Sequence, residues 1–276
     1  MHLIYKVLAE ASNELKEISG SNSIREARIL LEFVLKNQEK FLNTNHNISN
    51  NDFIIFQRLI KKRLKFQPIS QIIGERYFWK NKFFINSDVL DPRPDTETLI
   101  EHTLSFGSFF NILDLGTGSG CIILSLLDEY NAAMGIGVDK SKKALNVAKK
   151  NAELLNLNDR VKFQLGNWCD GLDNKFDLIV SNPPYISEKE ILGLSNDVIN
   201  WEPRIALTPE GDGLGAYKNI INGVKNILIP NGRLIFEIGH AQGNEVSNLL
   251  KSNNFKEINI VKDINNKDRV ISALWR

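Results

Sequence analysis

A short loop with two adjacent prolines is the part of the sequence best suited to chemistry. It reads Ser181-Asn182-Pro183-Pro184-Tyr185 and follows an apolar run. Each proline fixes its own φ angle, so the pair ends the preceding strand and stiffens the chain. The loop therefore presents an amide, backbone carbonyls and an aromatic ring in a fixed arrangement. A purely structural turn with Tyr185 in the core is the alternative, but four specified residues at this position rarely coincide.

Such a loop can activate a weak nitrogen nucleophile. An amide nitrogen reacts poorly because its lone pair is delocalised into the carbonyl. If the side-chain carbonyl of Asn182 and the backbone carbonyl of Pro183 accept its two N–H groups, the lone pair points at an electrophile while Tyr185 packs on the flat amide. Catalysis then comes mainly from orientation and electrostatic preorganisation. We predict Asn182, Pro183 and Tyr185 as catalytic, the substrate loop as Asn182, Pro183, Pro184 and Tyr185, and no metal.

A glycine-rich turn supplies the second half of the predicted site. The run from Asp114 to Gly120 ends one apolar segment and opens another, and its glycines allow close backbone approach to a ligand. The next predicted strand ends at Asp139, 19 residues after Gly120. A carboxylate there can accept hydrogen bonds from both hydroxyls of a ribose. These features together predict a nucleoside-containing cofactor.

Two details favour S-adenosyl-L-methionine, with S-adenosyl-L-homocysteine as product, over a nicotinamide dinucleotide. The spacing is Gly-x-Gly-x-Gly, one residue tighter than the dinucleotide form, and Asn167-Trp168 directly follow the third strand. An indole at that place can pack on adenine while a polar neighbour reads the exocyclic amine. The predicted cofactor-binding residues are Gly116, Thr117, Gly118, Ser119, Gly120, Asp139, Trp168 and Asn182.

The elements that must position these loops alternate between strands and helices. Predicted helices include 141–155 and 215–227, and the predicted strands are 111–115, 134–138, 161–165, 178–181, 233–238, 258–261 and 269–274. The alternation predicts a mostly parallel sheet, and the last two strands, joined by a short polar turn, predict an antiparallel end. The fold class is α/β, the Rossmann-like seven-stranded sheet that is usual in class I methyltransferases.

The region before this sheet has a different pattern. Residues 1–67 show helical periodicity and predict a small helical domain. Ser23 with Glu26 predicts a capping box, and Ser49 precedes a further helix. Residues 68–90, with Ile72, Ile73 and several aromatic residues, predict a β-hairpin linker, so the methyltransferase domain is predicted at 91–276.

Composition is that of a globular protein, and its charge is unevenly spread. Residues 1–90 carry 14 Lys/Arg against 9 Asp/Glu, and residues 91–276 carry 20 against 24, giving +5 and −4. The basic cluster, defined as Arg58, Lys61, Lys62, Arg63 and Lys65, is either a solvated helix face or a docking surface. No apolar run suggests a membrane span, and the two cysteines, at positions 121 and 169, suggest no disulfide or zinc site. We expect a cytoplasmic protein.

At this point the chain resembles the release-factor glutamine N5-methyltransferases, the PrmC/HemK family. The resemblance covers nearly the whole chain and is carried by the following motifs: Ile73-Gly74-Glu75, Pro92-Arg93-Pro94-Asp95-Thr96-Glu97, Asp114 to Gly120, Asp139, Trp168, Asn182 to Tyr185, Glu202-Pro203-Arg204, and Glu237-Ile238-Gly239 with Gln242-Gly243. It implies methylation of the glutamine in the Gly-Gly-Gln loop of bacterial class I peptide chain release factors, which act in translation termination. It also implies that the N-terminal helical domain docks this substrate.

Three residues depart from the family pattern. Asp91 replaces an apolar residue and should be solvated or paired. Asn167 stands where an acidic residue is common, so cofactor binding should be weaker but retained. Asn266 replaces a frequent turn glycine, and asparagine tolerates the left-handed conformation. The role of Arg93 stays open between contact with the cofactor carboxylate and support of the linker.

Other functions share parts of this pattern. An N6-adenine methyltransferase acting on RNA or DNA would use the same proline loop, but the near-neutral charge and the lack of a target-recognition region count against it. A scaffold that binds the cofactor without turnover and a nicotinamide-dependent dehydrogenase are further alternatives. We expect a protein partner, without nucleic acid or membrane.

Overall fold

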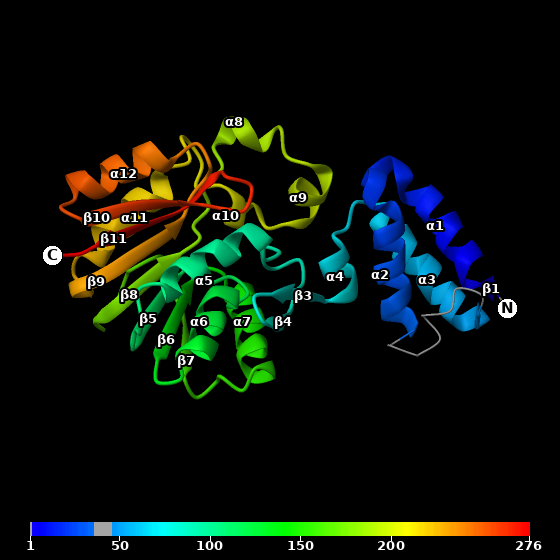
Figure 1. Cartoon of the computed structure of the whole chain (residues 1–276), viewed down its shortest axis with the longest axis horizontal. Helices are drawn as coiled ribbons and strands as arrows, with labels where there is room; N and C mark the ends of the chain where they lie inside the picture. The colour runs from blue at the N-terminus through cyan, green and yellow to red at the C-terminus, as the bar shows by residue number, and fades with distance from the viewer. Residues whose placement is uncertain (1, 36–45) are drawn as a thin grey trace. The chain divides into compact units, whose positions relative to one another are not determined.

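The computed structural model describes residues 2–35 and 46–276, and the chain divides into two compact units (Figure 1). The first unit comprises Met1–Gly74 with Ser195–Trp201, and the second comprises Glu75–Leu194 with Glu202–Arg276. Met1 and residues 36–45 of the predicted helical domain lie outside the described residues. Each unit buries a hydrophobic core of its own.

The first unit is built from short helices around one core. Its helices are α1 (Ile4–Ser19), α2 (Ser23–Leu35), α3 (Asn50–Arg63), α4 (Ile69–Ile73) and α9 (Asn196–Trp201), with a strand pair β1 (His2–Leu3) and β2 (Asn47–Ile48). Apolar residues at helical spacing on α1, α2 and α3 meet in the core, among them Leu15, Leu30 and Phe56, all fully buried.

The capping prediction for α2 is wrong. A 3₁₀ turn, Gly20–Asn22, runs directly into the helix, and Ser23 already has helical angles of φ −55° and ψ −44°. Glu26 instead accepts a hydrogen bond from Arg63 Nε at 2.8 Å. The prediction for Ser49 is confirmed, because its side chain accepts a hydrogen bond from the Asp52 amide at 3.0 Å and begins α3.

Two further features of the first unit differ from the sequence prediction. Ile72 and Ile73 belong to α4, which ends at Gly74 with a φ of 77°, so the hairpin is confined to β3 (Glu75–Phe78) and β4 (Asn81–Phe84). Helix α9, far along the chain, joins this unit: the Trp201 carbonyl accepts a hydrogen bond from Gln71 and its indole donates to the Lys65 carbonyl, both at 2.9 Å.

The second unit is organised around one seven-stranded sheet, as predicted. In chain order its strands are β5 (Asn111–Leu115), β6 (Met134–Asp139), β7 (Val161–Leu165), β8 (Phe176–Ser181), β9 (Leu228–Glu237), β10 (Lys256–Lys262) and β11 (Asp268–Leu274). Their order in the sheet is β10-β11-β9-β8-β5-β6-β7. The central pairs are parallel, and β11 runs antiparallel to both of its neighbours.

Helices cover both faces of this sheet. One face packs against α5 (Glu97–Leu104), α6 (Cys121–Glu129) and α7 (Lys142–Leu154), and the other against α11 (Gly215–Val224) and α12 (Gly243–Ser252). Successive strand residues point to opposite faces, so Ile112 lies in the first core and Leu113 in the second. Two short helices, α8 (Glu188–Ile191) and α10 (Arg204–Leu207), lie in the long connection between β8 and α11. None of the helices in the described part of the chain is long and apolar enough to cross a membrane.

Candidate active site

The sheet brings the two predicted loops to the same edge. Strand β5 pairs with β6 on one side and β8 on the other, so the order of the parallel strands reverses there. Ligands bind at such switch points, outside the carboxyl ends of the strands. The glycine turn follows β5 and the proline loop follows β8, and both line a cavity of about 260 Å³.

The structure brings most of the predicted site residues to this cavity. Those that line it are Gly116, Gly118, Asp139, Trp168, Asn182 and Pro184. Asn167, the departure from the family pattern, lines it as well. Five others sit in the same two loops without lining the cavity: Thr117, Ser119, Gly120, Pro183 and Tyr185. Thr117 and Ser119 are buried, which makes them supports for the turn.

The glycine turn needs backbone angles that glycine alone adopts easily. Gly116, Gly118 and Gly120 have φ angles of 75°, 55° and 79°. The Gly116 amide donates to the Val138 carbonyl at 2.8 Å, which ties the turn to the neighbouring strand. Beneath it, Thr117 Oγ1 donates to Asp114 Oδ2 at 2.7 Å. Burial raises the pKa of Asp114 to about 7, and the Thr117 hydrogen bond opposes that rise.

Asp139 and Trp168 line the cavity together with the glycine turn. The Asp139 carboxylate accepts the Gly118 amide at 2.9 Å and the Ser141 amide at 2.8 Å. A carboxylate offers about four lone-pair sites, so two remain for ligand hydroxyls. The Trp168 ring lies so near the turn that a Cβ atom added at Gly116 would be 3.5 Å from it. A carboxylate and an indole beside a glycine turn together suit a nucleoside.

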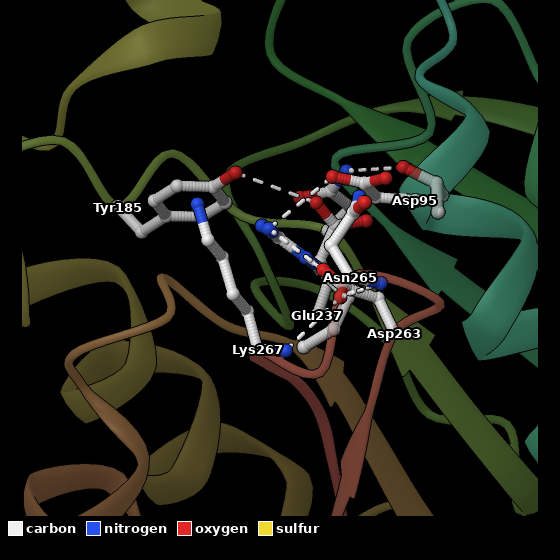
Figure 2. A network of polar contacts seen from close by, with 9 residues as sticks. Asp95, Tyr185, Glu237, Asp263, Asn265 and Lys267 are labelled. Atoms are coloured by element: carbon white, nitrogen blue, oxygen red, sulfur yellow. Dashed lines mark hydrogen bonds and ion pairs between the residues drawn. The ribbon is translucent and has the colours of Figure 1, made fainter.

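Side chains from distant segments hold the proline loop. Ser181 Oγ donates to the Leu115 carbonyl at 2.6 Å, in the core. Asn182 Nδ2 donates to Thr96 Oγ1 at 3.4 Å. The Tyr185 hydroxyl donates to Glu237 Oε1 at 3.4 Å, a contact drawn in Figure 2. The loop is therefore fixed from both ends.

Gln242 and Gly213 fix the backbone of the same loop. Gln242 Nε2 donates to the Tyr185 carbonyl at 3.0 Å, and Gln242 Oε1 accepts the Gly239 amide at 3.2 Å. Gly213 passes so close that a Cβ atom there would be 2.5 Å from the Tyr185 carbonyl oxygen. The loop therefore has almost no freedom to shift away from β9.

Glu237 is a buried carboxyl in contact with the proline loop. It is the last residue of β9, and it is 1% exposed to solvent. Burial raises its pKa to about 7, against hydrogen bonds from Thr96 and Tyr185 and the nearby Arg269 charge. Burial likewise raises the pKa of the Tyr185 phenol far above its ordinary value.

Sequence reasoning assigned no role to Thr96, Glu237 or Gln242. Glu237 could have been found, because a carboxylate that ends an apolar strand next to β8 must lie beside the residue that follows Ser181. The pairing of Ser181 with Phe236 places Glu237 there. Thr96 gives no such signal, since the 3₁₀ turn Pro94–Thr96 that carries it is distant in sequence.

The remaining predicted features have plain outcomes. Arg93 donates to both carboxylate oxygens of Glu202, at 2.8 and 2.9 Å. This ion pair supports the segment that precedes α5 and β5. Asp91 is paired, with Arg76 Nε 3.7 Å away, and Asn266 adopts a left-handed φ of 59°. Both cysteines are free. Within residues 2–35 and 46–276 no group of three or more His, Cys, Asp or Glu side chains is placed to hold a metal ion.

Comparisons with known proteins agree with this geometry. A methyltransferase domain model matches residues 108–271, and a PrmC N-terminal domain model matches residues 6–74. The fold is similar to that of a methyltransferase from Pyrococcus furiosus, with a TM-score of 0.53 at 15% identity over 70% of this chain and 87% of that one. Fold and site together define a class I methyltransferase.

Curated relatives narrow the class. The chain is 44% identical to the release factor glutamine methyltransferase of Cereibacter sphaeroides, over 79% of this chain and 78% of that protein. It is 36% identical to the release factor glutamine methyltransferase of Caulobacter vibrioides, over 97% of this chain and 95% of that protein. The chain belongs to the release factor glutamine methyltransferase family.

Proposed function

We propose that this enzyme transfers a methyl group from S-adenosyl-L-methionine to the N5 side-chain amide of the glutamine in the Gly-Gly-Gln loop of class I peptide chain release factors. The observation that carries the proposal is the meeting of the glycine turn and the proline loop at one cavity, with Asn182 facing it. Membership of the family supports the choice of substrate.

The cofactor side of the cavity fits S-adenosylmethionine. Asp139 has acceptor capacity left for the two ribose hydroxyls, and Trp168 offers a flat face to adenine. The positive φ angles of the glycine turn let the backbone approach the amino-acid part of the ligand. When bound, the cofactor supplies an electrophilic methyl group on a sulfonium.

The chain's own residues then orient the glutamine amide. Asn182 Oδ1 and the Pro183 carbonyl accept its two N–H groups, which turns the nitrogen lone pair toward the methyl carbon. The Tyr185 ring holds the amide plane in place. Because the loop is already fixed by Thr96, Glu237 and Gln242, little reorganisation accompanies the reaction. The proton leaves once methylation has made the nitrogen acidic.

Mass spectrometry of a release factor after incubation with enzyme and S-adenosylmethionine tests the proposal. We expect a single addition of 14 Da, about the mass of one CH₂ group, on the glutamine of the Gly-Gly-Gln peptide. A release factor carrying alanine in place of that glutamine is the matched control and should gain no label. Label that appears only in RNA or DNA, supplied in parallel, would instead establish the N6-adenine methyltransferase alternative.

The first unit docks the release factor in this proposal. Helix α3 and the turn that follows it present exposed side chains that combine Ile54 with four members of the basic cluster, Arg58, Lys61, Lys62 and Lys65. Arg63, the fifth member, is buried and paired with Glu26, so it belongs to the core of the unit. The exposed face suits a protein surface with acidic groups around an apolar centre.

Charge reversal on α3 tests this docking role. Lys61→Glu with Lys62→Glu should raise KM for the release factor about tenfold at low salt, with cofactor affinity unchanged. The matched control is Lys251→Glu with Lys256→Glu, two exposed lysines of the second unit. Equal KM values for the two double variants would contradict docking through α3.

A further inference from the structure

We propose that Glu237 and Thr96 are positioning residues that determine which way the Asn182 amide faces, so that its oxygen and not its nitrogen meets the substrate. The inference rests on the proposed function and deepens it. It starts from an asymmetry of the side chain itself. A primary amide has an acceptor end and a donor end of nearly the same size. Only the acceptor end can receive an N–H group of the substrate amide.

The contacts around Asn182 distinguish the two ends. Asn182 Nδ2 lies 3.4 Å from Thr96 Oγ1 and donates to it. The Thr96 side chain is 2% exposed, and its hydroxyl lowers the pKa of the Glu237 carboxyl, which is buried at the end of β9. Glu237 Oε2 has no hydrogen-bond partner among the described residues, so it is a buried acceptor in the same cluster as Thr96 and Asn182.

The proton count in this cluster fixes the direction of its hydrogen bonds. A hydroxyl has one proton to donate, and an ionised carboxylate can only accept. We infer that Thr96 donates its proton to the unpartnered Glu237 Oε2, and that the lone pairs of Thr96 accept from Asn182 Nδ2. Asn182 Oδ1 is then the end that is left for the substrate. A protonated Glu237, or a glutamine at position 237, can instead donate to Thr96. The Thr96 proton then points at Asn182 Nδ2, which is itself a donor, so the Asn182 amide is no longer held with Oδ1 toward the substrate.

The same carboxylate controls the other end of the loop. Tyr185, whose ring packs on the substrate amide in the proposed mechanism, donates its hydroxyl to Glu237 Oε1 at 3.4 Å (Figure 2). One buried acceptor thus orients both side chains that face the substrate. Because β8 and β9 are paired with Ser181 opposite Phe236, the carboxylate is held beside the loop by the sheet itself.

The groups around Glu237 set its pKa in a range where the pH dependence of kcat can report its ionisation. The groups that face it are Tyr185, Tyr217 on α11, Arg269 on β11 and Asp95 before α5. Burial and Asp95 raise its pKa, and Thr96, Arg269 and Tyr185 lower it, to about 7. Glu237 is therefore ionised above pH 7 and protonated below it. We expect kcat to fall as the pH is lowered through about 7.

Variants of Thr96 test the direction of the hydrogen bonds between Glu237, Thr96 and Asn182. Thr96→Val keeps the shape and removes the hydroxyl, and it should lower kcat about 10- to 100-fold because the reacting amide is misoriented. KM for the release factor and the affinity for S-adenosylhomocysteine should change less than about threefold, since Thr96 is buried and does not line the cavity. Thr96→Ser keeps the hydroxyl and should restore kcat to within about threefold of the wild type.

The matched control is Thr103→Val. Thr103 is fully buried on α5, and its hydroxyl donates to the Leu99 carbonyl at 2.7 Å, away from the site. This variant loses the same group and should keep its kcat even if it melts earlier. The inference is wrong if folded Thr96→Val, as judged by S-adenosylhomocysteine binding, keeps the wild-type kcat, or if Thr96→Ser is as slow as Thr96→Val.

Glu237→Gln gives an independent test when a threonine variant does not fold. It should lower kcat and abolish the decline of kcat between pH 8 and pH 6, because the group that titrates is gone. A decline that persists unchanged in this variant would overturn the role of Glu237. Failure of the wild type to methylate the Gly-Gly-Gln peptide would instead overturn the proposed function, so the two failures can be told apart.

Discussion

The glycine turn after β5 and the proline loop after β8 line one cavity but are held in place in different ways. The turn is fixed by near neighbours: Thr117 bonds Asp114, three residues away, and Asp139 bonds Gly118, 21 residues away. The proline loop is fixed by Thr96, Glu237 and Gln242, which are 86, 52 and 57 residues from their partners.

This difference reflects what each loop must do. In our proposal the turn binds the cofactor through backbone groups, and a local run of glycines with one following carboxylate is enough for that. In our proposal the proline loop aims a reacting amide, and side chains are held to such accuracy only by neighbours that are themselves fixed. We therefore expect variants of the two loops to separate cofactor binding from turnover.

The largest effect should come from Asn182→Ala. The variant loses an acceptor used mainly in the transition state, so kcat should fall about 100- to 1000-fold, as for the loss of one group that stabilises a transition state. Affinity for S-adenosylhomocysteine, measured by calorimetry, should stay within about tenfold of the wild type. A variant that keeps full activity would remove Asn182 from the mechanism.

Asp139→Ala should show the opposite profile. Its carboxylate is predicted to accept the ribose hydroxyls, and hydrogen bonds to a charged group contribute about 1.5–3 kcal/mol, so cofactor affinity should drop about 10- to 100-fold. With saturating cofactor, kcat should recover to within about threefold. Asp159→Ala, at an exposed aspartate after α7, serves as control and should bind the cofactor normally.

These two loops also differ in how far the sequence predicts them. The strands, in their order along the chain, and the glycine turn with Asp139 follow from local patterns, namely apolar runs and glycine spacing. The seven strands were predicted with small errors at their ends, although β9 begins five residues earlier than position 233, at Leu228. The supports of the proline loop were not predicted. Glu237 could have been found only with β9 taken as the neighbour of β8, and periodicity alone does not give that pairing.

The first unit shows the same limit. Ser23 and Glu26 have the spacing of a capping box, but Arg63 is 37 residues away and takes the Glu26 carboxylate. Ile72 and Ile73 are apolar residues in a short run, for which periodicity does not separate a strand from a helix. Helix α9 could not be assigned to this unit from its sequence, since its contacts with Gln71 and Lys65 span 130 and 136 residues.

A pair of glycine variants tests how tightly the proline loop is held. Gly213 and Gly211 both have positive φ angles, 79° and 62°, so alanine at either costs about 1 kcal/mol of backbone strain. Alanine at 213 also collides with the Tyr185 carbonyl, whereas a Cβ atom at 211 meets nothing within 4 Å. We expect Gly213→Ala alone to lower kcat, by about tenfold, because a small misplacement at the reacting centre is costly.

Similar melting temperatures with different kcat values for these two variants would locate the effect in the loop. If Gly211→Ala is as slow as Gly213→Ala, backbone strain in the segment explains both results, and the close contact with Tyr185 has no part in turnover.

The smallest effect should come from a side-chain hydrogen bond between the ends of the two strands that carry these loops. Ser181 Oγ, at the end of β8, donates to the Leu115 carbonyl at the end of β5 at 2.6 Å. Ser181→Ala should lower the free energy of unfolding by about 1 kcal/mol, the typical contribution of a buried neutral hydrogen bond.

Ser125 is equally buried, but its hydroxyl has no hydrogen-bond partner among the residues described here. Ser125→Ala should therefore be neutral or slightly stabilising in urea denaturation, since it removes an unsatisfied polar group from the core. Equal losses in the two variants would mean that the Ser181 bond contributes nothing beyond the volume of its oxygen atom, and that the two loops are joined only through the sheet.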